Sequence, residues 1–165
     1  MKRRRYASAV AALLIVAPVV VSLLHYGFTR VDDAYELQFR RSLAEAASGG
    51  DVLDMAAVAS FDWDRMYMFP PYTTRDRMEE TVGTKWTPPV SYVGYLIYRS
   101  ELGKYVLPDD SVHKLVFVRG GDVVLDVTLD RSVDFSSSRG LVLRNEARYA
   151  LERTADGRVV ARNTP

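Results

Sequence analysis

The feature that most constrains this chain is an uninterrupted apolar run near its beginning, from Tyr6 to Leu24. The run holds 19 residues without a charge, and a helix that rises about 1.5 Å per residue needs roughly this length to cross a bilayer. A basic cluster, Lys2-Arg3-Arg4-Arg5, precedes the run and is expected to stay on the cytoplasmic side. The sequence therefore predicts a single-pass membrane segment over residues 6–24, with the C-terminal domain outside the cytoplasm.

Three kinds of N-terminal segment fit such a pattern, and they differ at the end of the run. A cleaved signal peptide needs a small-x-small pair, whereas the chain reads Val21-Ser22-Leu23-Leu24-His25. A lipoprotein anchor needs a cysteine, and the chain has none. An uncleaved signal anchor over residues 1–27 is favoured, with an extracytoplasmic domain over 28–165, and a periplasmic or secreted protein released by cleavage is the alternative. Tyr26 and Phe28 suit the outer membrane–water interface.

The remainder of the chain has the composition of one ordinary domain. About 138 residues follow the first 27, enough to bury a hydrophobic core. Four of the 22 basic residues lie within the first 27 residues, and all 21 acidic residues lie after them. The domain over residues 28–165 therefore has a net charge of −3. A mildly acidic domain lacks the footprint of a nucleic-acid binder. The absence of cysteine excludes disulfides, thiolate metal sites and cysteine nucleophiles.

The first half of the domain alternates helical and extended patterns. Residues 31–48 are predicted as a helix with Asp32 or Asp33 as its N-cap, and Gly49-Gly50 is expected to end it in a left-handed cap. The apolar stripe of this helix is Tyr35, Phe39 and Leu43. Residues 51–57 suggest a further helical turn.

An aromatic-rich segment follows. Residues 61–69 alternate as a strand, which Pro70-Pro71 stops. Thr73 and Asp76 fit a capping box for a short helix over residues 74–82, and Gly83 fits its C-terminal cap.

The second half is predicted to be mostly strands. Residues 92–100 and 105–107 are aromatic and β-branched, and residues 141–143, 148–154 and 159–160 continue the pattern around a turn at Asp156-Gly157. A Ser-rich linker over 130–140 is expected to be mobile. The predicted fold class is α+β, with an N-terminal transmembrane or signal-anchor helix followed by short helices packed on an antiparallel sheet.

The clearest hairpin joins residues 112–119 to residues 122–129 through Gly120-Gly121. Its register places Val118 opposite Val123, Val116 opposite Leu125 and Val112 opposite Leu129. The expected core face consists of Val112, Val116, Val118, Val123, Leu125 and Val127. The other face consists of His113, Leu115, Phe117, Val124, Asp126 and Thr128.

The string F-D-W-D-x-x-Y-x-F-P-P-Y-T, which runs from Phe61 to Thr73, resembles a motif of small exported bacterial proteins of unknown function. That resemblance implies an exported α+β domain and assigns no catalytic residues. More distantly, the Pro-Tyr-Thr turn and the short helix that closes on Gly83 resemble outer-membrane assembly lipoproteins of the SmpA type. The lipidated cysteine of those proteins is missing from this chain.

The preferred binding residues come from the aromatic cluster. Ten of the 18 aromatic residues lie between Phe61 and Tyr105, with more tyrosine than phenylalanine. Core packing accounts for most of them, but tyrosine and tryptophan also favour interfaces, because they combine an apolar ring with a polar edge. Trp63, Tyr67 and Tyr72, around the Pro-Pro turn, are therefore predicted to form a recognition patch.

Two other groups of residues could carry chemistry. His113 lies diagonal to Asp126 in the predicted hairpin register, and an imidazole beside a carboxylate could act as an acid-base pair. Asp62 and Asp64 share a strand face and could contact a hard cation, but two carboxylates are too few to hold calcium. We predict no metal and no cofactor.

The sequence thus predicts a membrane-tethered extracytoplasmic module that binds an envelope protein or peptide, without catalytic activity. The alternative is a small envelope enzyme that uses His113 and Asp126 as an acid-base pair.

Overall fold

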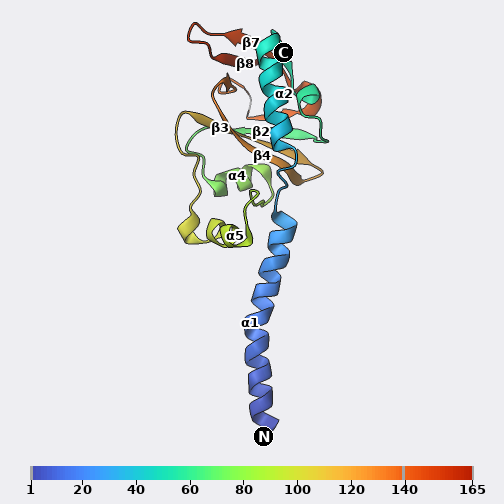
Figure 1. Cartoon of the computed structure of the whole chain (residues 1–165), viewed down its shortest axis with the longest axis vertical. Helices are drawn as coiled ribbons and strands as arrows, with labels where there is room; N and C mark the ends of the chain where they lie inside the picture. The colour runs from blue at the N-terminus through green and yellow to red at the C-terminus, as the bar shows by residue number, and fades with distance from the viewer. Residues whose placement is uncertain (1, 139, 165) are drawn as a thin grey trace.

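The computed structural model describes residues 2–138 and 140–164, with the side chains of residues 2–13, 15 and 101 outside the description. Helix α1 (Lys2–Thr29) projects from one end of the folded domain, and strands β7 and β8 lie at the other end (Figure 1). Among the described residues, no helix combines the length and the apolar character needed to span a bilayer. Many side chains of the predicted span at residues 6–24 lie outside the description, and the anchor stays a prediction.

The α+β class is confirmed. The described residues form five α-helices and two four-stranded sheets, with strand orders β1-β7-β8-β5 and β4-β3-β2-β6. The first sheet is not purely antiparallel as predicted, because β5 runs parallel to β8.

Helix α2 (Glu36–Gly49) confirms the first predicted helix of the domain, and Phe39 and Leu43 of its predicted apolar stripe are buried. Tyr35, the third residue of that stripe, precedes the helix and is exposed. The ends of the helix differ from the prediction. Tyr35 takes the N-cap position without a side-chain cap bond, while Asp32 accepts from the Ala34 amide in the preceding turn. Gly50 follows the helix in an extended conformation.

The next elements are short. Strand β1 (Val52–Asp54) and helix α3 (Met55–Val58) replace the single helical turn predicted over residues 51–57, and Asp54 caps α3 by accepting from the Ala56 amide. Strand β2 (Arg65–Phe69) confirms the predicted strand over a narrower range.

Helix α4 (Arg75–Val82) confirms the helix predicted after the Pro-Pro turn. Its cap is Thr74, which accepts from the Arg77 amide, and not Thr73. Gly83 ends it at φ 83°, the left-handed conformation that glycine adopts without steric cost.

The strand predicted over residues 92–100 is wrong. Residues Tyr92–Arg99 form helix α5, and Glu101–Gly103 form a short 3-10 helix, η1. Ser91 caps α5 by accepting from the Gly94 amide. The aromatic and β-branched composition favours a strand, but the cap and the packing of every third or fourth side chain override this weak preference.

Strands β3 (Val112–Arg119) and β4 (Asp122–Asp130) confirm the predicted hairpin, and Gly120 and Gly121 both have positive φ. A bulge between Phe117 and Val118 shifts the rest of the register by one residue. Phe117 consequently pairs with Leu125, and Val116 pairs with Asp126.

The C-terminal strands are β5 (Val133–Asp134), β6 (Leu141–Leu143), β7 (Arg148–Arg153) and β8 (Val159–Asn163), with a 3-10 turn η2 (Arg144–Glu146) between β6 and β7. The segment predicted as a mobile linker contains β5 and the buried side chains of Val133 and Phe135.

The hairpin is buried on both faces, which the sequence does not predict. The larger hydrophobic cluster gathers residues of α2, α3 and both sheets, and includes Leu115 and Phe117 from the face predicted to lie outside the core. The smaller cluster includes Val116 and Val118, together with residues of α4 and the segment before α5. The two sheets therefore share one core, and α4 covers the opposite side of the hairpin.

Candidate functional site

Strand β6 lies at the edge of its sheet, because among the described residues it pairs with β2 alone. The amide of Arg144 donates to the Asp64 carbonyl at 3.0 Å, and Gly140 accepts from the Met68 amide at 2.9 Å. In an antiparallel ladder, residues that bond to the neighbouring strand alternate with residues whose backbone groups point away from it. Gly140 and Arg144 bond to β2 and to the residue directly before it, so Leu141 and Leu143, one residue away from each, do not. The N–H and C=O groups of Leu141 and Leu143 therefore face outward.

The side chains of this strand alternate in exposure. Val142 is buried in the larger core, whereas Leu141 and Leu143 are 47% and 44% exposed. Edge strands are usually protected from pairing by short length, charged side chains or proline, and of these β6 has only its short length. The three residues of β6 include neither a charge nor a proline.

A hollow of about 490 Å³ opens beside the end of β6. Its lining residues are Ala56, Trp63, Asp64, Leu143, Arg144 and Asn145. Arg144 fixes this wall, since its guanidinium lies 5.4 Å from the centre of the Trp63 ring and donates to the Phe61 carbonyl at 3.0 Å. The Trp63 side chain is 2% exposed, and its Nε1 has no hydrogen-bond partner among the described residues.

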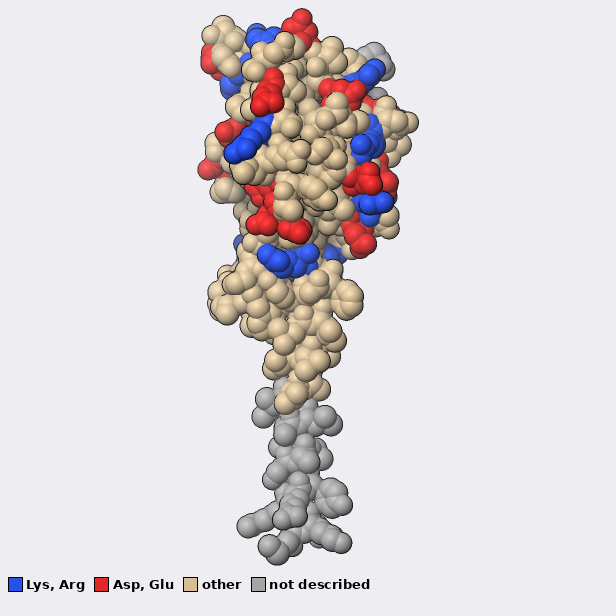
Figure 2. All heavy atoms as spheres, turned by 45° about the vertical axis from the view of Figure 1, so that its right-hand side comes forward, with Lys and Arg blue, Asp and Glu red and all other residues tan. Residues whose placement is uncertain are grey.

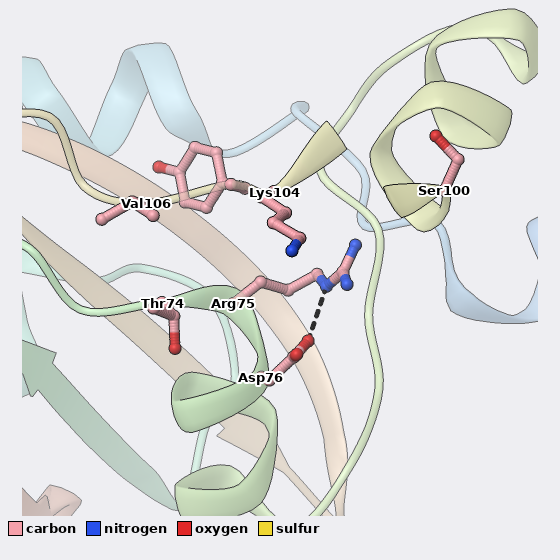
Figure 3. Close-up of a pocket in the computed structure, with 7 residues that line it drawn as sticks. Thr74, Arg75, Asp76, Ser100, Lys104 and Val106 are labelled. Carbon is pink, nitrogen blue, oxygen red and sulfur yellow. Dashed lines mark hydrogen bonds and ion pairs between the residues drawn. The ribbon is translucent and has the colours of Figure 1, made fainter. Parts of the chain in front are cut away.

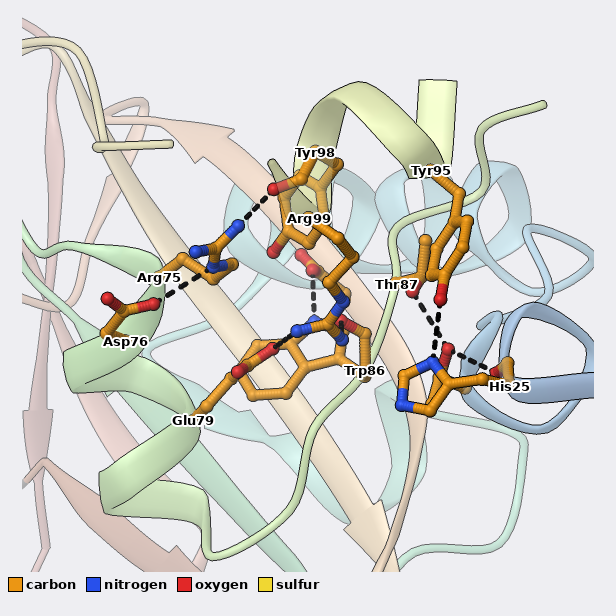
Figure 4. Close-up of polar contacts among 11 residues, drawn as sticks. His25, Arg75, Asp76, Glu79, Trp86, Thr87, Tyr95, Tyr98 and Arg99 are labelled. Carbon is orange, nitrogen blue, oxygen red and sulfur yellow. Dashed lines mark hydrogen bonds and ion pairs between the residues drawn. The ribbon is translucent and has the colours of Figure 1, made fainter. Parts of the chain in front are cut away.

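A second candidate region is a polar network between α4, α5 and the hairpin (Figure 4). Arg99 donates to Glu79 at 2.5 Å and to the Trp86 carbonyl at 2.6 Å. Trp86 Nε1 donates to Asp126 at 2.6 Å, and Asp126 forms a buried ion pair with Lys114. Apart from Arg99 Nε, which has no partner among the described residues, these polar groups are paired within the fold, so the network holds α5 and α4 to the hairpin.

A pocket of about 260 Å³ lies at the edge of this network (Figure 3). Its lining residues are Thr74, Arg75, Asp76, Ser100, Lys104, Tyr105 and Val106. Arg75 pairs with Asp76 at 3.0 Å and donates to the Tyr98 carbonyl. Burial, reinforced by the nearby carboxylates of Asp126 and Glu79, raises the pKa of Tyr98. The arrangement joins α4 to α5, and we assign it a structural role.

The predicted recognition patch is not one surface. Trp63 belongs to the larger cluster and Tyr67, which is 5% exposed, belongs to the smaller one. Tyr72 is 59% exposed in a left-handed backbone conformation. Because β2 begins only at Arg65, the alternation that would place Trp63 and Tyr67 on one face is interrupted. Of the three residues, only Trp63 lines the hollow.

The predicted facing of His113 and Asp126 is wrong. The bulge pairs His113 with Leu129 and places Asp126 beside Lys114 on the opposite face. His113 is 2% exposed against Phe135, and neither ring nitrogen has a hydrogen-bond partner among the described residues. Burial is the main reason that its pKa is lowered to about 4. His113 and Asp126 lie on opposite faces of the hairpin and therefore do not form the predicted acid-base pair.

The two aspartates considered for calcium have separate structural partners. Asp62 pairs with Arg119 at 3.3 Å, and Asp64 accepts from the Gly120 amide at 2.6 Å. Within the described residues, no three histidine, aspartate or glutamate side chains come close enough to hold a metal ion.

Sequence reasoning missed Leu141, Leu143 and Arg144. The strand over 141–143 was predicted, but a sequence pattern does not reveal which strand lies at the edge of a sheet. Nothing in the apolar triplet Leu141-Val142-Leu143 distinguishes an edge strand from an inner one.

Comparison of the chain with protein-family models, with curated proteins and with solved structures gives no match. The two family resemblances of the aromatic segment therefore stay predictions.

Proposed function

We propose that this chain is a membrane-tethered extracytoplasmic binding module that receives an extended segment of an envelope protein along strand β6. Residues 6–24 form the anchor, and the domain after them presents the binding edge. The proposal involves no catalytic step.

The observation that carries this proposal is the exposed edge of β6. Leu141 and Leu143 combine outward backbone groups with half-exposed apolar side chains, and no charge protects the strand from pairing. A peptide that adds a strand gains main-chain hydrogen bonds, and pockets for its alternate side chains supply the specificity. The hollow beside Leu143, which Trp63 and Arg144 line, could receive such a side chain of the peptide.

The tether is supported by the basic cluster and the uncharged run at the start of the sequence. The mildly acidic domain supports a protein partner rather than a nucleic acid.

Photo-crosslinking in cells tests the proposal on the full chain. A photoreactive side chain replaces Leu143, and the matched control replaces Val52, which is 59% exposed on β1 at the edge of the other sheet. We expect an envelope-protein adduct from position 143 and none from position 52. Equal adducts from both positions, or none from position 143, contradict the proposal.

Direct binding then tests the mode of recognition. Peptides of the captured protein are titrated against the full chain in detergent. We expect Leu141→Lys to weaken binding about tenfold, or about 1.4 kcal/mol, because the charge opposes strand addition. Val52→Lys should leave the affinity unchanged.

A further inference from the structure

Helix α5 presents its aliphatic side chains to the outside. Val93, Leu96 and Ile97 share one face at spacings of three and four residues, and they are 65%, 45% and 54% exposed. The opposite face carries Tyr92 and the buried Tyr95. A helix on a water-facing surface normally has the reverse arrangement, with its apolar stripe toward the core.

The position of α5 is fixed against the last turns of α1 (Figure 1). Tyr92 Oη donates to Ser22 Oγ at 3.0 Å, and Tyr95 Oη lies 2.9 Å from His25 Nδ1 (Figure 4). Tyr26 Oη also donates to the Val90 carbonyl, at 2.7 Å. The tyrosine face of α5 therefore packs on the segment of α1 that emerges from the predicted anchor, and the aliphatic face of α5 points away from α1.

Both helices expose apolar side chains at this end of the domain. Leu23, Leu24 and Phe28 of α1 are 46%, 56% and 87% exposed. Leu102, in η1 directly after α5, is 92% exposed. Single exposed apolar residues are normal on a protein surface, but a contiguous group marks an interaction site.

The charge pattern indicates what this surface meets. No charged residue lies between Lys85 and Arg99, and Arg99 points inward to Glu79. Figure 2 shows an uncharged surface at this end, bordered by basic side chains where the charged part of the domain begins. Arg30 and Lys85 are among the exposed basic residues. In a phospholipid interface the acyl chains lie deeper than the phosphates. Aliphatic residues next to the anchor, followed by basic residues farther from it, match this order.

We propose that α5 and η1 form a second membrane contact, in which their aliphatic side chains enter the outer interface of the phospholipid bilayer beside the anchor. This inference rests on the proposed tether. The bilayer is the occupant because α5 packs against the helix that continues from the anchor, and its exposed aliphatic face lies in the uncharged stretch between Lys85 and Arg99. With two contacts, the domain is held at a fixed height and orientation over the membrane.

Site-directed nitroxide labelling tests the contact, since the native chain has no cysteine. Single replacements Val93→Cys, Leu96→Cys and Leu102→Cys place labels on the apolar surface, and Ala155→Cys in the β7–β8 turn is the water-exposed control. Leu14→Cys, 70% exposed on α1, reports the anchor. The full chain is reconstituted in vesicles of phosphatidylethanolamine and phosphatidylglycerol, and unchanged tryptophan fluorescence verifies the fold of each variant.

We expect accessibility to molecular oxygen to exceed accessibility to a water-soluble nickel chelate several-fold at positions 14, 93, 96 and 102, with the opposite ratio at 155. If position 14 reports lipid while 93, 96 and 102 report water, the second contact is overturned and the tether stands, and this result would assign the apolar surface to a protein partner instead. If position 14 also reports water, the tether fails and the inference fails with it.

Discussion

On one face of the β3–β4 hairpin, His113 is buried against Phe135 in the larger core, with no hydrogen-bond partner for its ring among the described residues. On the other face, the next residue, Lys114, is equally buried but forms an ion pair with Asp126, which also accepts from Trp86. Two adjacent residues of one strand therefore meet the cost of burial in different ways.

The difference follows from what each environment supplies. His113 can lose its charge near neutral pH, so a mostly apolar pocket accepts it as the neutral base. A lysine ordinarily stays protonated at neutral pH, and its burial needs a carboxylate and further hydrogen bonds to the pair. Buried titratable groups are often read as signs of catalysis, whereas both of these are explained by packing.

The largest expected effect comes from breaking the ion pair. Asp126→Ala leaves the Lys114 ammonium uncompensated and removes the acceptor of Trp86 Nε1. We expect the free energy of unfolding to fall by about 3–5 kcal/mol. Urea unfolding of the full chain in mild detergent, followed by the fluorescence of the buried Trp63 and Trp86, measures the loss.

An exposed ion pair is the matched control for this variant. Glu152→Gln removes the pair with Arg162, in which both side chains are more than half exposed, and should cost at most about 1 kcal/mol. A loss in Asp126→Ala no larger than in Glu152→Gln would show that the buried pair does not form.

A smaller loss of stability is expected when acid protonates His113, on the other face of the hairpin. The pKa of His113 is about 4 in the folded chain, against 6.5 as the ordinary value. Between these values the unfolded chain binds a proton that the folded chain does not, so the free energy of unfolding decreases as the pH falls. The loss reaches about 3 kcal/mol at pH 4.

The comparison with His113→Leu isolates this contribution. Asp134, Asp130 and Arg131, the charged groups that act on His113, are present in both proteins. Urea midpoints at pH 7 and pH 4.5 should differ less in the variant than in the native chain. An identical acid dependence in the two proteins would mean that His113 is accessible to protons in the folded state.

The features predicted correctly from the sequence are those that neighbouring residues determine. The glycines at 120 and 121 define the hairpin turn, and Gly83 ends α4, because both depend on backbone conformations that glycine adopts readily. The bulge at Phe117 depends on packing against distant elements. Since a shift of one residue exchanges the two faces of a strand, this bulge moved Leu125, Asp126 and Val127 to the faces opposite to those predicted. The faces of β3 stay as predicted, but both of them are buried.

The candidate site was predicted in part for a similar reason. Trp63 was identified by its aromatic segment, but Tyr67 is buried in a different cluster once the strand is covered on both sides. The edge position of β6 follows from strand order, which connects residues far apart in the sequence. Helix α5 was missed because its aromatic and β-branched residues favour a strand, a weak preference that its cap and its packing on α1 override.

The smallest effect is expected when both charges are removed together. Lys114→Met with Asp126→Asn eliminates the ion pair, while the asparagine carbonyl can still accept from Trp86 Nε1. Because no uncompensated charge remains, we expect a stability within about 1–2 kcal/mol of the native chain, well above that of Asp126→Ala. The same urea titration measures the difference. A double variant as unstable as Asp126→Ala would show that this face depends on the pair itself, and not merely on avoiding an isolated charge. The two faces would then differ in kind, since one would require a charge pair where the other accepts a neutral ring.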